Sequence, residues 1–150
     1  MLQRIPATLP AYLDYRNHAD NNSLYNTPPV FAIWTIKLVL EHMKKNGGLA
    51  AVADRNLKKA GLVYGVIDAS GGFYRSPVDA RYRSNMNLVF RLPSEELEKK
   101  FIDEAKAAGM IGLKGHRSVG GCRASLYNAM TLEGAETLAS FMKEFAAKNE

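Results

Sequence analysis

The chain has 150 residues, of which 47% are hydrophobic and 23% charged, and these proportions are typical of one ordinary globular domain. Its formal net charge of +5 comes from 20 Lys and Arg against 15 Asp and Glu that are scattered along the sequence, so the charge does not demand a nucleic-acid partner. Cys122, the single cysteine, excludes an internal disulfide, and no apolar stretch is long enough to span a bilayer, so we expect a cytoplasmic protein with no membrane partner.

The N-terminal segment, residues 1–27, carries turn and loop chemistry. It contains Pro6, Pro10 and a polar run over 17–23, and it offers few apolar side chains to a core. We expect an extended segment that does not begin an independent fold and is either an extension or a cut end.

A helix is predicted over 28–46. Thr27 can cap it, the two prolines that follow fit a first helical turn, and Gly47 with Gly48 ends it. Apolar residues cover most of its circumference, and such a helix needs cover on more than one side. The pattern therefore implies a partner surface for this helix.

The rest of the chain alternates between helices and short strands. The expected elements are a helix over 49–68, a strand over 86–92, a helix that stops at Gly109, strands over 110–113 and 123–127, and a last helix capped by Thr131. Gly120 and Gly121 are typical of a two-residue hairpin turn. This order predicts an α/β (α+β) fold in which helices pack on a small mixed or antiparallel sheet.

The stretch Lys114–Ser125 concentrates anion-binding chemistry, because it sets His116, Arg117 and Arg123 around three glycines. Arginine offers a planar fork of donors to carboxylate or phosphate, and glycine lets a backbone approach an anion closely. One interpretation is a site for a small carboxylated or phosphorylated molecule, and the other is a basic turn with solvated arginines. The sequence has no P-loop, no GxSxG or HExxH motif and no metal-spaced cluster, so we expect no metal site.

Several longer motifs agree in order and spacing with one known family. They are NTPP at 26–29, YGVID at 64–68, FY at 73–74, RSNMN at 83–87, LKGHRSVGG at 113–121 and RASLYNA at 123–129. From about residue 12 onwards the chain closely resembles the phosphoserine aminotransferases, which belong to class V of the pyridoxal-phosphate-dependent aminotransferases.

The resemblance implies a fold and a reaction. The fold is the small C-terminal domain of a fold-type I transferase, with 1–27 as the cut end of the large domain, 28–150 as the small domain and 28–46 as an interdomain helix. The reaction is the transfer of an amino group between glutamate and 3-phosphohydroxypyruvate, which gives phosphoserine for serine biosynthesis. The implied assembly is a homodimer with pyridoxal phosphate as cofactor.

The resemblance also implies roles for particular residues. Arg123 would pair with the α-carboxylate of the substrate, and the geometry of a guanidinium supports that role independently. His116 and Arg117 would help to hold the substrate's phosphoryl group. Asn26 and Thr27 would reach the cofactor phosphate of the neighbouring subunit, and a helix N-terminus at Thr27 would favour an anion there.

The chain departs from the family in one respect that matters for catalysis. None of its 11 lysines lies in the family's Schiff-base context, so it supplies no catalytic residue of its own. We therefore expect this chain to be inactive by itself and to act within the full-length enzyme. The alternative is a stand-alone anion-binding or interaction module derived from that domain, and a weaker third candidate is nucleic-acid binding through the net positive charge.

The predicted hairpin raises a geometric problem for the substrate site. With the turn at Gly120 and Gly121, His116 would face Ser125, and His116 and Arg123 would share one face while Arg117 points to the other. Either the segment is irregular around Gly115, or the His116–Arg117 pair and Arg123 serve the sites of different subunits.

Overall fold

A computed structural model describes residues 8–149, and its contacts group the chain into two units, one up to His42 and one from Met43. Within the described residues, no helix is long and apolar enough to cross a membrane. The domain boundary expected at 27/28, with 28–46 as an interdomain helix, remains a prediction.

The first unit contains two short helices where the sequence predicted an extended segment. They are the 3-10 helix η2 (Ala11–Leu13) and the α-helix α1 (Tyr15–Asp20). The Asp14 carboxylate caps α1 by accepting from the backbone N–H of Arg16 at 2.9 Å. The prediction of extended chain was therefore wrong for the residues of these two helices. Local capping stabilises a helical turn even where few apolar side chains are available. Residues 1–7 of the predicted segment lie outside the described part.

Helix α2 (Val30–Lys45) lies within the predicted range of 28–46. Thr27 does not cap it: the first regular helical bond runs from the N–H of Ile33 to the carbonyl of Pro29, at 3.1 Å. None of its residues is buried. Its exposed large apolar side chains are Val30, Phe31, Ile33, Trp34, Ile36, Leu38, Val39 and Leu40.

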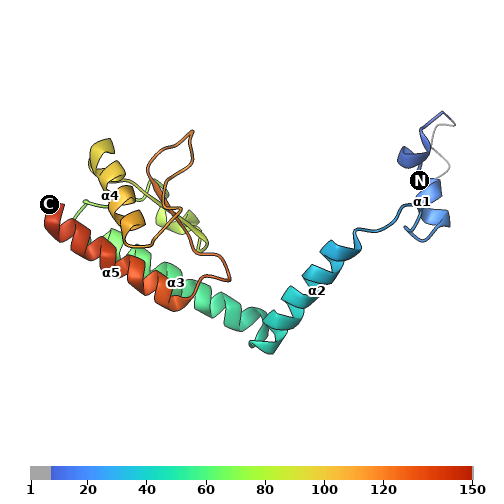
Figure 1. Cartoon of the computed structure of the whole chain (residues 1–150), viewed down its shortest axis with the longest axis horizontal. Coiled ribbons are helices and arrows are strands. Elements are labelled where there is room, and N and C mark those ends of the chain that lie inside the picture. Colours follow the sequence, from blue (N-terminus) through green and yellow to red (C-terminus); the bar gives the residue numbers. More distant parts are fainter. Residues whose placement is uncertain (1–7, 150) are drawn as a thin grey trace. The chain divides into compact units, whose positions relative to one another are not determined.

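The second unit is built on three helices, shown in Figure 1. Helix α3 (Gly48–Ala69) and helix α5 (Leu132–Asn149) lie side by side, and α4 (Glu95–Ala107) packs through Phe101 and Ala105 into the same core. Ser94 caps α4 by accepting from Leu97 N–H. Thr131 caps α5 by accepting from Gly134 N–H, as expected from the sequence.

A two-stranded antiparallel sheet completes this unit and confirms a fold of helices on a small antiparallel sheet. Strand β1 (Asn87–Phe90) pairs with β2 (Cys122–Ser125), with Asn87 opposite Ser125 and Phe90 opposite Cys122. Alternate residues of both strands are buried against the helices. The buried residues are Leu88, Phe90, Cys122 and Ala124.

The strand predicted over 110–113 is wrong, because this segment has no strand geometry. A single bridge pairs Lys114 with Cys122, and the N–H of Arg123 donates to the carbonyl of Leu113 at 2.8 Å. Leu113 is buried while Ile111 is 80% exposed, so one apolar anchor attaches an otherwise irregular segment to β2. An apolar run of four residues does not by itself distinguish a strand from such an anchor.

Candidate functional site

Arg123 lies on the open face of the sheet. The buried neighbours Cys122 and Ala124 point into the core, so alternation along β2 turns the Arg123 side chain to the other face, together with its cross-strand partner Val89. Its Nε atom is shielded from solvent but has no hydrogen-bond partner among residues 8–149. A shielded guanidinium donor without a protein acceptor is suited to a carboxylate from a ligand.

Asn87 gathers a polar cluster on the same face. Its Oδ1 accepts from the hydroxyl of Ser125 at 3.1 Å and from the phenol of Tyr127 at 3.2 Å. The backbone N–H groups of Met86 and Asn87 both donate to Ser84 Oγ, which fixes the entry into β1. Sequence reasoning singled out none of these side chains, although the expected strand alternation offered a way to find them.

The segment that leads to β1 is held by a charged contact. Arg83 donates from both terminal nitrogens to the Asp68 carboxylate, at 2.7 and 2.9 Å, and lies over the ring of Tyr64 at 4.7 Å. The Arg83 guanidinium keeps the pKa of the Asp68 carboxyl below its ordinary value. The C-terminal end of α3 therefore holds the loop that leads into β1, whose first residue is Asn87.

The chain between Leu113 and β2 turns three residues earlier than predicted. The carbonyl of His116 accepts from the N–H groups of Val119 and Gly120, at 2.9 and 2.8 Å, and Gly115 N–H donates to the carbonyl of Gly121. The two-residue hairpin at Gly120–Gly121 is therefore wrong, and so is the pairing of His116 with Ser125. A side chain at Gly115 would collide with the backbone of Gly120, so glycine permits this tight approach.

His116 is oriented by its own loop. Its Nδ1 lies 2.7 Å from the Ser118 hydroxyl and accepts from the Ser118 N–H at 3.3 Å. Because a backbone N–H can only donate, Nδ1 must be the acceptor, and the proton of a neutral ring then sits on Nε2. His116 therefore presents an N–H donor at the atom that carries no contact within the loop.

An open cleft of about 730 Å³ lies between this loop and α4. His116 and Arg117 line it from the loop, Lys99 lines it from α4, and Arg123 is not among the described residues that surround it. The two groups of sequence-predicted site residues in this unit are thus found in different places, one at the cleft and one on the sheet face. The irregular segment around Gly115 removes the alternation argument that was applied to His116.

Asn26 and Thr27 lie in the first unit, in the exposed segment that precedes α2. Pro28 and Pro29 follow them and have no N–H, and Val30 N–H is already bonded to the Pro28 carbonyl at 2.8 Å. The helix N-terminus thus offers fewer amides to an anion than the sequence suggested. The donors that remain are the two side chains and their own backbone N–H groups.

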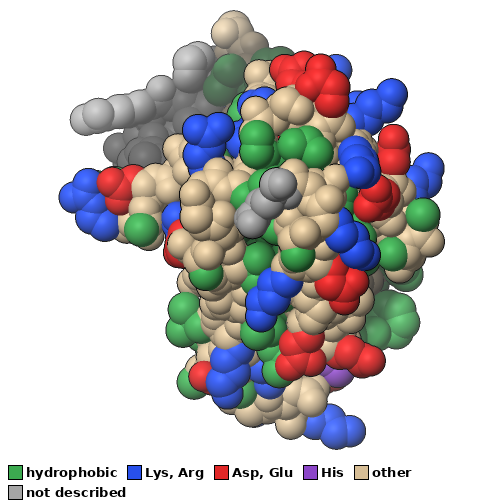
Figure 2. Space-filling model, turned by 90° about the vertical axis from the view of Figure 1, so that its left-hand side faces the viewer, with side chains coloured by type: hydrophobic (Ala, Val, Ile, Leu, Met, Phe, Trp, Pro, Cys, Tyr) green, Lys and Arg blue, Asp and Glu red, His purple; other side chains and the backbone are tan. Residues whose placement is uncertain are grey.

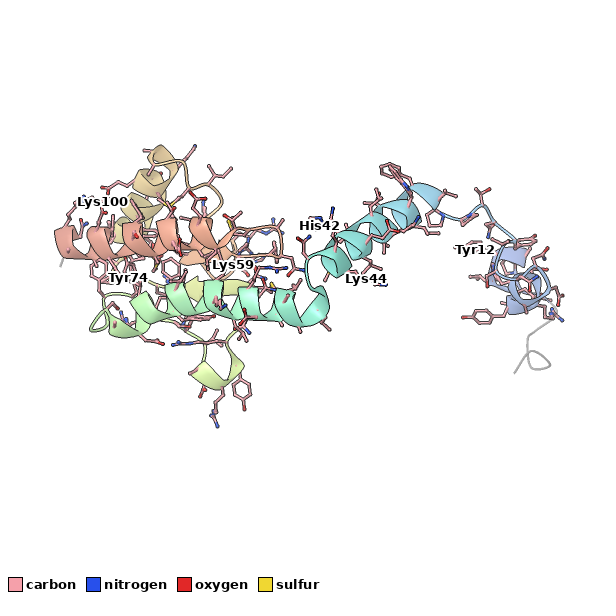
Figure 3. All side chains as sticks on the ribbon, turned by 90° about the horizontal axis from the view of Figure 1, so that it is seen from below. Tyr12, His42, Lys44, Lys59, Tyr74 and Lys100 are labelled. Carbon is pink, nitrogen blue, oxygen red and sulfur yellow. The ribbon has the colours of Figure 1, made fainter. Side chains whose placement is uncertain are left out.

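A buried lysine holds the segment that follows β2. Lys59 is only 2% exposed and donates from Nζ to the carbonyls of Leu126, Tyr127 and Met130, at 3.2, 2.8 and 2.9 Å. Figure 3 shows it on α3, on the side that faces α5. Burial lowers the pKa of the Lys59 ammonium, and the charge of Arg55 lowers it further. A lysine on a helix is ordinarily solvated, so its residue type alone would place Lys59 on the exposed face, whereas the fold buries it.

Further observations concern three other possible functions: a reactive cysteine, nucleic-acid binding and metal binding. Burial, with a smaller contribution from the charge of Glu98, raises the pKa of the Cys122 thiol to about 12, so this cysteine is a core residue with no nucleophilic character. Figure 2 shows Lys and Arg interspersed with Asp and Glu on the face in view, without a continuous basic stripe there. Within residues 8–149, no group of His, Cys, Asp and Glu has the arrangement of a metal site.

Several known proteins are similar to this chain in sequence and in fold. A phosphoserine aminotransferase from Geobacillus kaustophilus is 58% identical over 145 residues, which make up 97% of this chain and 40% of that protein. The solved phosphoserine aminotransferase from Bacillus circulans subsp. alkalophilus superposes with a TM-score of 0.88 at 50% identity, over 99% of this chain and 41% of that one. The PLP-bound phosphoserine aminotransferase from Trichomonas vaginalis gives 0.79 at 36% identity, over 93% and 40%.

The chain thus spans about 40% of the length of the relatives it matches. The family model described as aminotransferase class-V matches residues 8–138, which is most of the chain. The chain therefore belongs to the class-V aminotransferase family.

Proposed function

We propose that this chain is the C-terminal part of a phosphoserine aminotransferase. In the complete enzyme, a cytoplasmic homodimer that binds neither nucleic acid nor membrane would transfer an amino group between glutamate and 3-phosphohydroxypyruvate. The reaction uses pyridoxal phosphate, which supplies the electron sink for amino-group transfer when it is bound. The contribution of this chain is recognition of the substrate's two anionic ends.

The proposal rests mainly on the shielded guanidinium of Arg123, whose Nε has no hydrogen-bond partner among the described residues. Its guanidinium is held on β2 with Nε shielded and without a protein acceptor among the described residues, so the cost of desolvating it is recovered when a ligand carboxylate binds. A bidentate pair would also orient the α-carbon of the amino acid. The neighbouring Asn87 cluster keeps the face polar and ordered.

We assign the phosphoryl group to the loop that carries His116 and Arg117. The Nε2 proton of His116 and the guanidinium of Arg117 both present donors without an acceptor in the loop, and phosphate oxygens accept from such groups. Neither residue needs to exchange a proton with the substrate for this role. They bind and orient it, and they discriminate against amino acids that lack the phosphoryl group.

Asn26 and Thr27 fit a supporting role toward the cofactor phosphate. Both are exposed and have hydroxyl or amide donors. Two such residues contribute hydrogen bonds to a phosphate whose other contacts come from elsewhere. This fits the proposal that they complete the site of a neighbouring subunit.

The test of the proposal uses the chain and the native protein. The chain alone, with pyridoxal phosphate, phosphoserine and 2-oxoglutarate, should form no glutamate above the blank, since it has no Schiff-base lysine. Glutamate formation proportional to the amount of chain would contradict this. The protein in its native source should have a mass well above that of 150 residues, whereas a native mass of only 150 residues would favour the stand-alone binding module.

The separation of Arg123 from the His116 cleft leads to a second proposal about the complete enzyme. We infer that the two groups serve different subunits, so that each site takes Arg123 from one subunit and His116 with Arg117 from the other. The absence of Arg123 among the described residues lining the cleft supports this arrangement.

Hybrid dimers test that arrangement directly. One subunit would carry Arg123→Ala and the other His116→Ala with Arg117→Ala, each variant being nearly inactive as a homodimer. If the sites are shared, a hybrid contains one intact site and recovers up to half of the wild-type activity per dimer. If each subunit supplies both groups to its own site, both sites of the hybrid are damaged and no activity returns.

A further inference from the structure

The loop 114–121, which carries His116 and Arg117, is tied to the body of the domain by Arg91. This arginine follows β1 directly, and its Nη1 donates to the carbonyl of Val119 at 3.1 Å. The backbone of Arg91 is fixed as well, because it exchanges two hydrogen bonds with Arg75, at 2.8 and 3.0 Å. One guanidinium therefore reaches from a paired backbone to the turn of the loop (orange in Figure 1, beside α4).

Glu98 holds the other edge of the same guanidinium. Its Oε1 accepts from Arg91 Nε at 2.5 Å and from the backbone N–H of Leu92 at 3.3 Å. The Glu98 side chain is only 8% exposed, so this carboxylate on α4 is largely removed from solvent, and its Oε1 is satisfied by the two donors. The result is a continuous path from α4 through Glu98 and Arg91 to Val119.

The loop is shaped to accept this contact. Gly121 has φ near +70°, and a Cβ there would lie 2.5 Å from Cδ of Arg91 and 2.9 Å from the carbonyl oxygen of Phe90. A Cβ on Gly120 would touch the Arg91 guanidinium at 3.6 Å. The contact at Gly120 would be an ordinary one, so it is Gly121, one of the two glycines that the sequence suggested as a hairpin turn, that lets the loop lie directly against the Arg91 side chain.

We propose that Arg91 and Glu98 are positioning residues that hold the loop 114–121 ready for the substrate's phosphoryl group. The inference rests on the proposed function of His116 and Arg117. Arg91 and Glu98 line the same cleft, and in the proposed role they act through the loop and not by contact with the ligand. A loop that is ordered before binding does not lose conformational entropy at binding, so the contact raises affinity without adding a bond to the ligand. It also couples the loop to α4, which lines the opposite side of the cleft.

Hydrogen exchange of the loop amides tests the positioning role without any ligand. In Arg91→Met, the amides of Gly115, Val119 and Gly120 should exchange about tenfold faster, while those of the β1–β2 pair stay unchanged. The matched control is Arg81→Met, because Arg81 is exposed and contacts Asp79 and the ring of Tyr82, neither of which belongs to the loop. Loop exchange in Arg91→Met within about twofold of this control would overturn the proposal.

Glu98→Gln is the second variant and covers a failure of Arg91→Met to fold. It keeps an oxygen that can accept from Arg91 but removes the charge, so the loop amides should show an intermediate increase. Arg91→Lys should rescue only part of the wild-type protection, because a single ammonium on a flexible stem does not span both Glu98 and Val119. Full rescue by lysine would contradict the two-sided contact.

Titration with O-phospho-L-serine separates the positioning role from the proposed function. If both hold, wild-type chain binds the ligand and Arg91→Met binds it about tenfold more weakly, with the loop amides loosened. Unchanged affinity despite a loosened loop overturns the positioning role. If the complete enzyme binds O-phospho-L-serine equally well with and without His116 and Arg117, while Arg91→Met loosens the loop, the phosphoryl assignment is wrong and the structural tie stands.

Discussion

Replacing Lys59 with methionine tests how the segment after β2 is held in place. The ammonium is 2% exposed and donates to three backbone carbonyls, those of Leu126, Tyr127 and Met130. All three acceptors are backbone carbonyls, and none of them is a carboxylate. Methionine occupies a similar aliphatic volume but offers no donor, so all three carbonyls lose their partner.

The magnitude follows from two opposing contributions. Hydrogen bonds to a charged group contribute about 1.5–3 kcal/mol each, and carbonyls left buried without a donor carry a further cost. The substitution also removes the cost of burying the ammonium, which is expressed in the lowered pKa of Lys59. The net loss of unfolding free energy should therefore be about 2–4 kcal/mol.

Lys58→Met is the matched control on the same helix. Lys58 is 62% exposed and pairs with Asp54 at 2.8 Å, so its replacement should cost less than about 0.5 kcal/mol. Urea unfolding followed by circular dichroism at neutral pH gives both values. A Lys59→Met variant as stable as Lys58→Met would refute the reasoning, because the three carbonyl contacts would then contribute nothing.

The two variants Lys59→Met and Lys58→Met should also differ in how their unfolding free energy depends on pH. Burial sets the folded pKa of Lys59 below its ordinary value of 10.5, so between these two pKa values the unfolded chain binds more protons than the native chain. The contribution of Lys59 to stability should therefore rise as the pH approaches 10.5. Lys59→Met should lack this rise, whereas Lys58→Met should retain it.

Arg123→Lys keeps the charge on β2 but loses the planar fork, so the affinity for O-phospho-L-serine, measured by calorimetry, should fall at least about tenfold. Equal affinities in the variant and the wild type would exclude a bidentate role. Ser118→Val removes the hydroxyl contact to Nδ1 of His116, so ¹⁵N NMR should show a smaller share of the Nε2–H tautomer, and an unchanged share would show that Ser118 does not set it. Cys122 has a folded pKa of about 12 against 9.0 for an ordinary thiol, so its contribution is complete below pH 9.0 and is lost as the pH rises toward 12. Cys122→Ala should therefore lack an alkaline loss of about 2 kcal/mol near pH 10.5, and parallel stability curves for the variant and the wild type would contradict the raised pKa.

Local signals in the sequence were sufficient for most helices. Ser94 and Thr131 precede apolar residues at helical spacing, and both cap the helices that the spacing predicted. The alternation of apolar residues likewise identified β1, and β2 was expected as the returning strand of the hairpin, although each strand is shorter than expected. These features depend on neighbours within a few residues, which is why the sequence is informative about them.

In the candidate site, too, some features follow from short stretches of sequence and others depend on the tertiary structure. The sequence alone identified the arginines, the histidine and the family motif around Arg123, because these are properties of a short stretch. Tertiary structure decided where the loop turns, since Gly121 lies against Arg91 and Phe90 and not at a hairpin tip. It also decided that His116 lines a cleft which Arg123 does not.

Buried charges are the clearest case of what only the tertiary structure decides. Lys59 reaches carbonyls 67 to 71 residues further along the chain, and Arg91 joins Glu98 to the carbonyl of Val119, 28 residues from Arg91. A charged residue on a helix is typically solvated, so residue type alone predicts exposure for Lys59 and Glu98. The sequence determined which groups can bind an anion, whereas the fold determined which charges are removed from water, because that depends on what packs against them.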